Sequence, residues 1–465
     1  MNNNKNKIFF SGIAGSGVSA IASFMAEKGH RVYGSDRAFD INPDHPLKQT
    51  LQTKDITIVP QDGNGLDGSF DLAVFSTAVE ADRPEVLKAR ELGIPVMTRP
   101  EYLSEITSSF KTIAVSGTSG KSTASGMLAF LMSRSGLSPN FIGGGRVTQF
   151  KTSSNPGNSL TGSSDYLIIE ACESDGSIVN YRPLHTIILN LSLDHHTVDV
   201  TAGMFNTLIK HTKGKIFVNA DDINLAGMAA EDTVTFSLDN PSNFRAEDIT
   251  YKPFSTDFSL HNVKFTLSLP GRHNLYNALS CIAVLAELGI PASNIAAALP
   301  EFQGIERRFA VHLNDGKNLV IDDYAHNPHK IASLMETVRR ISGRVCYIFQ
   351  PHGFGPTRLM KKEYIQTFVD SLRESDHLIL LPIYYTGGTA SKDISSQDLA
   401  DEIKAGGKSV EVMENRKDVL RKINNYNTCI IFGARDESLS EFAEEIATSL
   451  RFSPPLQGGA RGGNG

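Results

Sequence analysis

Short apolar runs alternate with longer segments of helical periodicity along nearly the whole chain. Apolar runs of this kind are typical of strands buried on both faces, and the amphipathic segments between them are typical of helices that cover a sheet. The strand-like runs lie at 7–10, 31–35, 72–76, 112–115, 166–170, 186–190, 319–323, 345–350, 378–382 and 429–433. Such an alternation predicts an α/β fold with largely parallel sheets.

The alternation falls into three blocks, which we interpret as three domains. Residues 1–108 predict a Rossmann-like N-terminal domain, 109–308 a central parallel-sheet domain, and 309–450 a second, C-terminal Rossmann-like domain. The length of 465 residues agrees, because one domain typically takes about 100–200 residues. Residues 451–465 form a low-complexity tail rich in Gly, which we expect to be disordered and to which we assign no function.

The central block opens with a glycine turn between a predicted strand and a predicted helix. The turn comprises Gly117, Thr118, Ser119, Gly120, Lys121, Ser122 and Thr123. In this arrangement backbone N–H groups and the helix N-terminus bind phosphates, Lys121 would pair with the outer phosphates, and the Ser122 hydroxyl can ligate Mg²⁺. The full Walker pattern has a further glycine where this chain has Val115. An ordinary glycine turn is the alternative, but the Gly-Lys-Ser-Thr order at a strand–helix junction favours a P-loop-like phosphate site.

Polar side chains follow the next strands of this block. Glu170 ends one strand and Glu173 lies in the turn after it, whereas Asp194 and His195 follow the next strand. In parallel sheets ligands bind beyond the carboxyl ends of the strands. Oxygen donors suit Mg²⁺ well, and a His ligand is less usual. Taken singly, each side chain could belong to a solvated loop; together they predict a magnesium–nucleotide site that includes Ser122, Glu170 and His195.

A second glycine-rich turn lies near the start of the chain. Gly12, Gly15, Ser16 and Gly17 separate the first strand from a helix, and Asp36 follows the second strand. A βαβ unit with a glycine turn and an acidic residue after its second strand is typical of nucleotide binding. The glycines do not follow the regular G-x-G-x-x-G order, so tight packing is the alternative. The position of Asp36 favours a nucleotide-type ligand.

Two later segments also carry candidate ligand contacts. Asn274 and Asn277 precede an apolar helix predicted at 278–288, and they could either cap that helix or contact a base or ribose. In the third block, Asp323 and His326 follow a strand, which again places a carboxylate and a histidine at a strand end.

Composition limits the classes of function. The chain is 40% hydrophobic and 21% charged, as in ordinary soluble globular proteins, and its net charge of -6 does not suggest a nucleic-acid partner. The four cysteines form no C-x-x-C pair and are expected to be reduced thiols in a cytoplasmic protein. The N-terminal residues lack an apolar region, so no signal peptide is expected, and no apolar run approaches the roughly 18 residues of a membrane span.

The order and spacing of these motifs resemble the Mur ligases of peptidoglycan synthesis. The resemblance covers most of the chain, and the short ATP loop of this family explains the incomplete Walker pattern. Within the family, the set is most similar to the ligases that add L-alanine. The segments that carry the resemblance are 12–19, 34–36, 117–123, 170–175, 190–195, 271–274, 302–308 and 322–328.

The resemblance implies a reaction and a role for each motif. ATP would phosphorylate the carboxylate of UDP-N-acetylmuramate, and the amine of an amino acid would attack the acyl phosphate to give an amide, ADP and phosphate. The implied catalytic residues are Lys121, Glu170, His195, Arg308 and His326. The implied ATP contacts are the glycine turn at 117–123 together with Asn274, Arg308 and Asp323, and the implied UDP-sugar contacts are Gly12, Gly15, Ser16, Gly17 and Asp36. The resemblance also implies a hinge motion that closes the third block onto the second. It does not decide whether the protein is a monomer or a dimer.

The segment expected to bind the amino acid departs from the family pattern. Gly353 and Pro356 stand where the L-alanine-adding ligases have two arginines, and Cys172 stands where they have Asp. Loss of a bidentate carboxylate partner lowers affinity, so either Arg358 or another basic residue replaces it, or the acceptor is not alanine. The alternatives to an L-alanine ligase are therefore a ligase for another amino acid or for a non-murein UDP-sugar acid. A nicotinamide-dependent oxidoreductase and a non-catalytic nucleotide-binding homologue are further alternatives.

Overall fold

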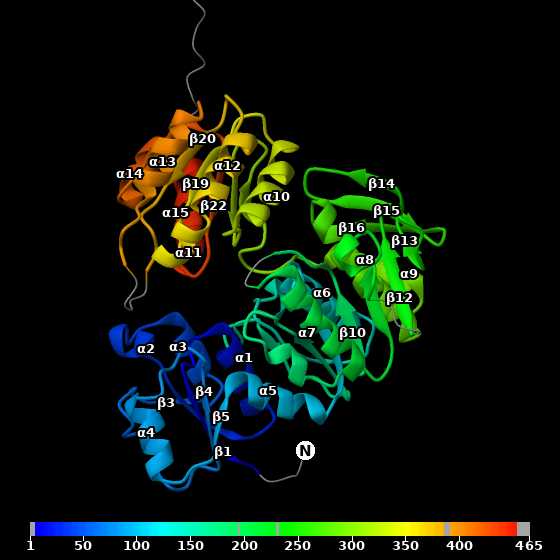
Figure 1. Cartoon of the computed structure of the whole chain (residues 1–465), viewed down its shortest axis with the longest axis vertical. Helices are drawn as coiled ribbons and strands as arrows, with labels where there is room; N and C mark the ends of the chain where they lie inside the picture. Colours follow the sequence, from blue (N-terminus) through cyan, green and yellow to red (C-terminus); the bar gives the residue numbers. More distant parts are fainter. Residues whose placement is uncertain (1–4, 194–195, 229–231, 386–390, 453–465) are drawn as a thin grey trace, which may run out of the picture. The chain divides into compact units, whose positions relative to one another are not determined.

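The computed structural model describes residues 5–193, 196–228, 232–385 and 391–452. The chain forms two compact units, Met1–Ile305 and Glu306–Gly465. The first unit contains a five-stranded, an eight-stranded and a three-stranded sheet, and the second unit contains a six-stranded sheet (Figure 1).

The five-stranded sheet is parallel throughout, with the order β3-β2-β1-β4-β5. Every residue of the central strand β1 is buried, because its apolar side chains pack on both faces of the sheet. The sheet confirms the predicted Rossmann-like N-terminal domain. Its strands are β1 (Lys7–Ser11), β2 (Arg31–Ser35), β3 (Thr57–Ile58), β4 (Leu72–Phe75) and β5 (Val96–Thr98), and its helices are α1 (Ser16–Glu27), α2 (Arg37–Ile41), α3 (Pro46–Gln52), α4 (Pro84–Glu91) and α5 (Arg99–Ser108).

The eight-stranded sheet has the order β13-β12-β11-β10-β6-β9-β7-β8, and its strands pair in parallel except for β7 with β8. The strand that precedes the glycine turn, β6, therefore lies between β10 and β9, and β9 ends in Glu170, another predicted site residue. The strands are β6 (Lys111–Ser116), β7 (Asn140–Ile142), β8 (Ser159–Leu160), β9 (Tyr166–Glu170), β10 (His185–Ile188), β11 (Ile216–Asn219), β12 (Thr233–Ser237) and β13 (Phe244–Arg245).

Helices cover this sheet, and buried side chains form a core on each face. One core joins α6 and α8, and the other continues into the N-terminal domain through α1 and α5. This shared core explains why the first two domains form one compact unit. The helices are α6 (Lys121–Arg134), α7 (Val198–His211), α8 (Arg272–Glu287) and α9 (Ala292–Ala298), with short 3₁₀ turns η1 (Thr148–Phe150), η2 (Ser177–Asn180), η3 (Ile223–Leu225) and η4 (Leu299–Glu301).

A small antiparallel sheet follows the eight-stranded one, and the sequence analysis did not predict it. Its strands β15 and β16 alternate buried and more exposed residues, as expected when only one face meets a core. That face contributes Phe258, Phe265 and Leu267 to the core around α8. The strands are β14 (Glu247–Tyr251), β15 (Thr256–Leu260) and β16 (Val263–Leu267).

The second unit contains a sheet of order β17-β18-β22-β19-β20-β21, parallel except for the edge strand β17. This parallel core confirms the second Rossmann-like domain. The strands are β17 (Ala310–Asn314), β18 (Leu319–Asp323), β19 (Cys346–Phe349), β20 (His377–Leu380), β21 (Val410–Val412) and β22 (Thr428–Phe432). The helices are α10 (Pro328–Arg339), α11 (Phe354–Leu359), α12 (Lys361–Ser371), α13 (Ser396–Ala405), α14 (Arg416–Lys422) and α15 (Ser438–Phe452), with the 3₁₀ turn η5 (Ile423–Asn425).

Two helix boundaries differ from the sequence expectation. Helix α8 begins at Arg272 rather than at residue 278, because Gly271, with φ of 94°, reverses the chain and serves as its N-cap. Helix α15 runs to Phe452 and so includes the first residues of the expected tail; residues 453–465 lie outside the described part.

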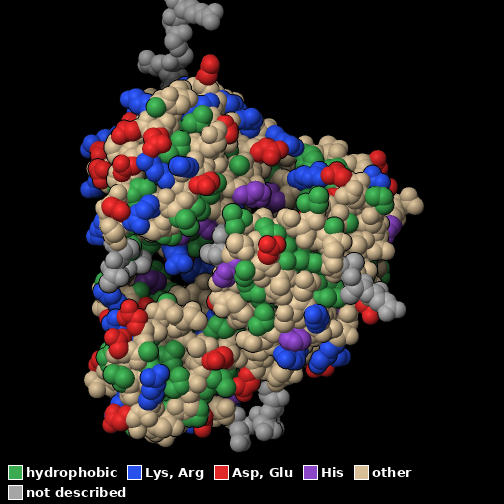
Figure 2. Space-filling model, viewed as in Figure 1, with side chains coloured by type: hydrophobic (Ala, Val, Ile, Leu, Met, Phe, Trp, Pro, Cys, Tyr) green, Lys and Arg blue, Asp and Glu red, His purple; other side chains and the backbone are tan. Residues whose placement is uncertain are grey.

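None of the helices in the described ranges is both long and apolar enough to span a membrane. Acidic and basic side chains are mixed over the face shown in Figure 2.

Candidate active site

The glycine turn after β6 is locked in shape by its neighbours. Ser119 N donates to Asn190 Oδ1 at 2.8 Å, and Asn190 Nδ2 donates back to Ser119 O at 2.9 Å. Gly120 is the N-cap of α6 with φ of 89°, and a Cβ at this position would lie 2.5 Å from Asn277 Oδ1. A side chain would therefore be strained in both conformation and space, so the turn requires glycine here.

Lys121, the first residue of α6, points back into the turn. Its Nζ donates to Gly117 O at 2.6 Å and forms an ion pair with Glu173 Oε2 at 2.8 Å. Burial opposes ionisation and is the largest influence, but the neighbouring Cys172 and Glu173 side chains raise the pKa of Lys121 above its ordinary value. Lys121 is therefore a permanently charged, sheltered ammonium group beside the start of a helix, as phosphate binding requires.

The Ser122 hydroxyl and the Glu170 carboxylate lie together beside this turn. Ser122 Oγ donates to Glu170 Oε2 at 3.0 Å, and the backbone N–H groups of Gly144 and Gly145 donate to Glu170 Oε1 at 2.7 and 3.2 Å. These hydrogen bonds fix the carboxylate at the end of β9. A hydroxyl and a carboxylate oxygen are hard donors that fit Mg²⁺, so these two side chains would hold the ion.

The predicted third metal ligand cannot be placed. His195 and the neighbouring Asp194 lie outside the described residues. Within the described ranges, no group of three or more His, Cys, Asp or Glu side chains is arranged to hold a metal ion. The role expected for His195 therefore stays a prediction.

Asn274, expected to contact a base, lies in the first turn of α8. Its side chain is buried, and Nδ2 donates to Pro270 O at 2.7 Å. Asn277 Nδ2 donates to Asn274 Oδ1 at 3.4 Å, so the two amides form a chain beneath Gly120. Neither residue is the N-cap of α8, which is Gly271. A base contact by Asn274 stays a prediction.

The glycine turn of the N-terminal domain is tied to the end of β2. Gly12 N donates to Ser35 O at 2.9 Å, and a Cβ at Gly12 (φ of 77°) would lie 2.7 Å from Ser76 Cβ. Asp36 accepts from Ala14 N and Ala38 N, both at 2.9 Å, and so caps α2 while it holds the turn. Gly15 is the N-cap of α1, followed by Ser16 and Gly17. Asp36 thus shapes the turn, and its predicted contact with the UDP-sugar is untested.

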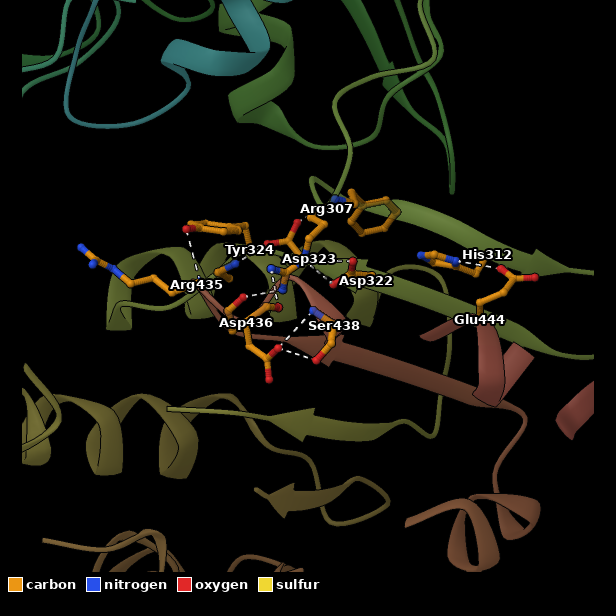
Figure 3. A network of polar contacts seen from close by, with 12 residues as sticks. Arg307, His312, Asp322, Asp323, Tyr324, Arg435, Asp436, Ser438 and Glu444 are labelled. Carbon is orange, nitrogen blue, oxygen red and sulfur yellow. Dashed lines mark hydrogen bonds and ion pairs between the residues drawn. The ribbon is translucent and has the colours of Figure 1, made fainter. Parts of the chain in front are cut away.

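In the second unit, the adjacent residues Arg307 and Arg308 have different surroundings, and Figure 3 shows Arg307 beside Asp322. Arg307 is buried, pairs with Asp322 at 3.2 Å and donates to Gly433 O at 2.7 Å. The Arg308 guanidinium instead lies over the Tyr324 ring, 4.7 Å from its centroid. Arg307 therefore stabilises the end of β18, whereas Arg308, half-buried, is the one of the pair more accessible to a phosphate.

Asp323 and His326 follow β18. Asp323 accepts from Phe309 N and Ala325 N, both at 2.7 Å, and burial raises the pKa of its carboxyl. Burial, aided by the charge of Lys330, lowers the pKa of His326 to about 3, so this imidazole is neutral at physiological pH. The His326 ring lies 5.3 Å from the His352 ring, centroid to centroid. The structure thus brings His326 to the segment expected to bind the amino acid.

That segment contains one arginine, Arg358, and its guanidinium is already paired. Arg358 Nη2 forms an ion pair with Asp393 and donates to Ser391 O at 3.0 Å. Gly353, with φ of 69°, is the N-cap of α11, and Pro356 lies within that helix. An amino-acid carboxylate would have to compete with Asp393 for Arg358.

Two residues of the site were not assigned roles from the sequence. The sequence places Glu173 only in the turn after a strand, and the structure makes it the ion-pair partner of Lys121. Asn190 was part of a resembling segment, yet its amide holds Ser119. Both positions follow strand ends in the same sheet, and this placement is the sequence signal that points to them.

The parallel sheet, the glycine turn and the Lys–Ser pair at the start of α6 place the protein in the class of P-loop-like α/β proteins. Sequence profiles of three domains match successive parts of the chain: the Mur ligase family catalytic domain at residues 7–111, the Mur ligase middle domain at 115–285, and the Mur ligase glutamate ligase domain at 307–450. The chain belongs to the Mur ligase family.

Curated relatives and solved structures are similar over most of the chain. The UDP-N-acetylmuramate–L-alanine ligase of Legionella pneumophila (strain Lens) is 31% identical over 88% of this chain and 89% of its own length. The ligase of the same name from Caldicellulosiruptor saccharolyticus is 32% identical over 90% and 93%. The UDP-N-acetylmuramate–alanine ligase structure from Thermotoga maritima has a TM-score of 0.79 and 25% identity, covering 96% and 99% of the two chains.

Proposed function

We propose that the protein is an ATP-dependent ligase that joins L-alanine to UDP-N-acetylmuramate in peptidoglycan precursor synthesis. Membership of the Mur ligase family and the names of the similar ligases support this proposal. The observation that carries it is the arrangement of Lys121, Ser122 and Glu170 at the glycine turn, which is suited to a triphosphate. A reaction that uses ATP and a nucleotide-linked precursor belongs in the cytoplasm.

The proposed reaction has two steps. A carboxylate oxygen of UDP-N-acetylmuramate attacks the γ-phosphorus of ATP, ADP leaves, and an acyl phosphate forms. The amine nitrogen of the amino acid then attacks the acyl carbon, phosphate leaves, and the amine loses a proton. Both steps develop negative charge on phosphoryl oxygens, which fixed positive charge stabilises.

The residues of this chain supply that stabilisation. Lys121 presents its ammonium at the start of α6, and Arg308 provides a second cation, placed over Tyr324. Ser122 and Glu170 would hold Mg²⁺, which supplies charge neutralisation on phosphoryl oxygens when bound. His326, neutral at physiological pH, would lie near the incoming amine, which a neutral imidazole can position by hydrogen bonding.

A different amino-acid acceptor is the second candidate. The pairing of Arg358 with Asp393 favours it, because this pairing engages the arginine of the segment that contains Gly353 and Pro356. An acceptor whose carboxylate is bound by other groups would not need the missing arginines.

Phosphate release tests both candidates. The purified protein is assayed with ATP, Mg²⁺ and UDP-N-acetylmuramate, and each amino acid is added in turn. We expect release with L-alanine, with Lys121→Ala lowering kcat by about 100-fold or more while UDP-sugar binding is retained. Lys215→Ala, which removes a surface lysine paired with Asp232, is the matched control and should leave turnover unchanged.

Each result has a distinct meaning. Release with another amino acid but not with alanine replaces the first candidate by the second. If no amino acid supports release, the acid substrate is not UDP-N-acetylmuramate. Full turnover by Lys121→Ala would refute the role of the glycine turn.

A further inference from the structure

A serine, a histidine and a glutamate lie together at the start of two neighbouring strands of the second unit. His377 is the first residue of β20, and the next residue, Leu378, donates from its N to Ser409 O at 3.0 Å and pairs with Val410 of β21. His377 therefore lies beside Ser409. Glu411 comes two positions after Ser409, so its side chain points to the same face of the sheet. The register of β20 and β21 thus brings the three side chains together.

The three side chains form a continuous hydrogen-bonded chain. Ser409 Oγ lies 2.7 Å from His377 Nδ1, and His377 Nε2 lies 2.5 Å from Glu411 Oε1. An ionised carboxylate only accepts hydrogen bonds, so when the imidazole is neutral Nε2 carries its proton and Nδ1 accepts from the Ser409 hydroxyl. Nucleophile, base and orienting carboxylate follow one another in this order in serine hydrolases, with the two ring nitrogens exchanged.

Two further side chains hold the carboxylate and the imidazole. Lys422 of α14 forms an ion pair with Glu411 Oε1 at 2.6 Å. Burial would raise the pKa of Glu411, but hydrogen bonds from Lys422 and His377 lower this pKa below its ordinary value, so the carboxylate is ionised at neutral pH. The Tyr426 ring stacks on the His377 ring, with the centroids 6.0 Å apart and the planes at 15°. The imidazole is therefore held in one orientation, as a general base must be.

The hydroxyl of this cluster is open to solvent, and the base is sheltered. Ser409 is exposed, whereas the His377 side chain is only 11% exposed. The cluster lies at the starts of parallel strands, and Asp323 lies at the end of β18 in the same sheet. The cluster is therefore at the opposite edge of the sheet from Asp323 and takes no part in the proposed ligase reaction.

We propose that Ser409 is a second nucleophilic site, which takes the acyl group of an activated ester, with His377 as its general base and Glu411 as the positioning residue for that base. Ser409 Oγ attacks the carbonyl carbon, and its proton passes to His377 Nδ1. The bond from this carbon to the alcohol oxygen then breaks, and the alcohol leaves with the proton from Nδ1. A positioned base contributes about 10²–10⁴-fold, so the ester must have a good leaving group such as a phenol.

Two reagents test the proposal on the full-length protein. A fluorophosphonate, which forms a stable bond to an activated serine oxygen as fluoride leaves, locates the nucleophile by peptide mass spectrometry. p-Nitrophenyl acetate measures acyl transfer by release of nitrophenolate. We expect Ser409 to be labelled at least about 100-fold faster than Ser375, which is also exposed but donates to Gly343 O at 2.8 Å rather than to an imidazole.

Variants assign the role of each side chain, and circular dichroism verifies that each variant is folded. His377→Gln should slow labelling of Ser409 by about 100-fold or more. Glu411→Gln should slow it by about ten-fold or more, because an amide does not fix the proton on Nε2, and Glu411→Asp, which keeps the carboxylate, should recover part of this loss. Ser375→Ala is the matched control and should leave labelling of Ser409 unchanged.

The proposal is overturned if Ser409 in the folded wild type is not labelled, or is labelled no faster than Ser375. Labelling that His377→Gln leaves unchanged overturns it too, because Ser409 would then react without a base. If His377→Gln does not fold, the comparison of Glu411→Gln with Glu411→Asp decides by the same criterion. Equal release of nitrophenolate by the wild type and Ser409→Ala would also contradict acyl transfer to Ser409. None of these outcomes bears on the proposed ligase function, which the phosphate-release assay tests separately.

Discussion

Glu85 is a carboxyl group with no exposed surface at the ends of two neighbouring strands. From α4 it accepts from Ser11 Oγ, at the end of β1, at 2.5 Å and from Ser35 Oγ, at the end of β2. These serines immediately precede Gly12 and Asp36. Glu85 therefore ties together the strand ends from which the first glycine turn and the α2 cap emerge.

Glu85 should make stability depend on pH. Burial is the largest influence and raises the pKa of Glu85 above 4.5, although the serine hydroxyls oppose the shift. The folded state then holds the Glu85 proton more tightly than the unfolded state does. The stabilisation of the fold by protonated Glu85 is therefore complete at pH below 4.5 and is lost as the pH rises through the folded pKa. Relative to Glu85→Gln, which cannot ionise, the wild type should lose stability as the pH rises above 4.5.

Urea unfolding of both proteins across this pH range measures the difference. Asp67→Asn provides the contrast, because hydrogen bonds from Ser69 lower the pKa of Asp67 to about 2 and this carboxyl stays ionised throughout the range. A stability difference between wild type and Glu85→Gln that is constant with pH would show that Glu85 ionises as readily in the folded chain as in the unfolded one.

At the scale of elements, the start of α6 depends on a glycine that two other elements surround. Gly120→Ala must place a Cβ 2.5 Å from Asn277 Oδ1 on α8 and 3.2 Å from Leu189 Cδ1, in a left-handed conformation. Gly136, just past the end of the same helix, also has positive φ, 81°, but a Cβ there would have no atom within 4 Å. Comparison of alanine variants at Gly120 and Gly136 therefore separates the cost of a left-handed backbone, which both share, from the cost of the steric clash, which only Gly120→Ala has.

We expect Gly136→Ala to cost about 1 kcal/mol and Gly120→Ala to cost about 2 kcal/mol more, with loss of turnover only in the latter. The free energy of unfolding and the rate of phosphate release measure the two effects. Equal stability of the two variants would mean that the Asn277 side chain can move away from the new Cβ without a loss of stability. Packing against α8 would then not fix the conformation of the turn.

The elements that the sequence predicted well are those with local signals. The β6–turn–α6 unit has an apolar strand, paired glycines and a Lys–Ser start, and these suffice to place it. The sequence did not predict the start of α8, because this start depends on the positive φ of Gly271. It also did not predict the sheet β14–β16, because no turn signal between these short strands was recognised. The pairs Lys121–Glu173 and Arg99–Asp175 join residues far apart in sequence, so no local pattern shows them.

At the scale of the whole molecule, the two compact units have separate cores. The core of the second unit gathers side chains of β18, β19, β22 and α15. In this unit Arg307 links the ends of neighbouring strands, because it pairs with Asp322 and donates to Gly433 O and Asp436 O. All these partners belong to the second unit, so a change there should act on that unit alone.

Differential scanning calorimetry tests this independence. We expect more than one unfolding transition in the wild type, because each unit buries its own apolar core. Asp322→Ala leaves the buried Arg307 guanidinium without its carboxylate, which should cost about 3–5 kcal/mol and lower only one transition, by about 10 °C. Asp232→Ala, which breaks the exposed pair with Lys215 in the first unit, should move neither transition by more than about 2 °C. A single transition that shifts as a whole in Asp322→Ala would show that the two units unfold together.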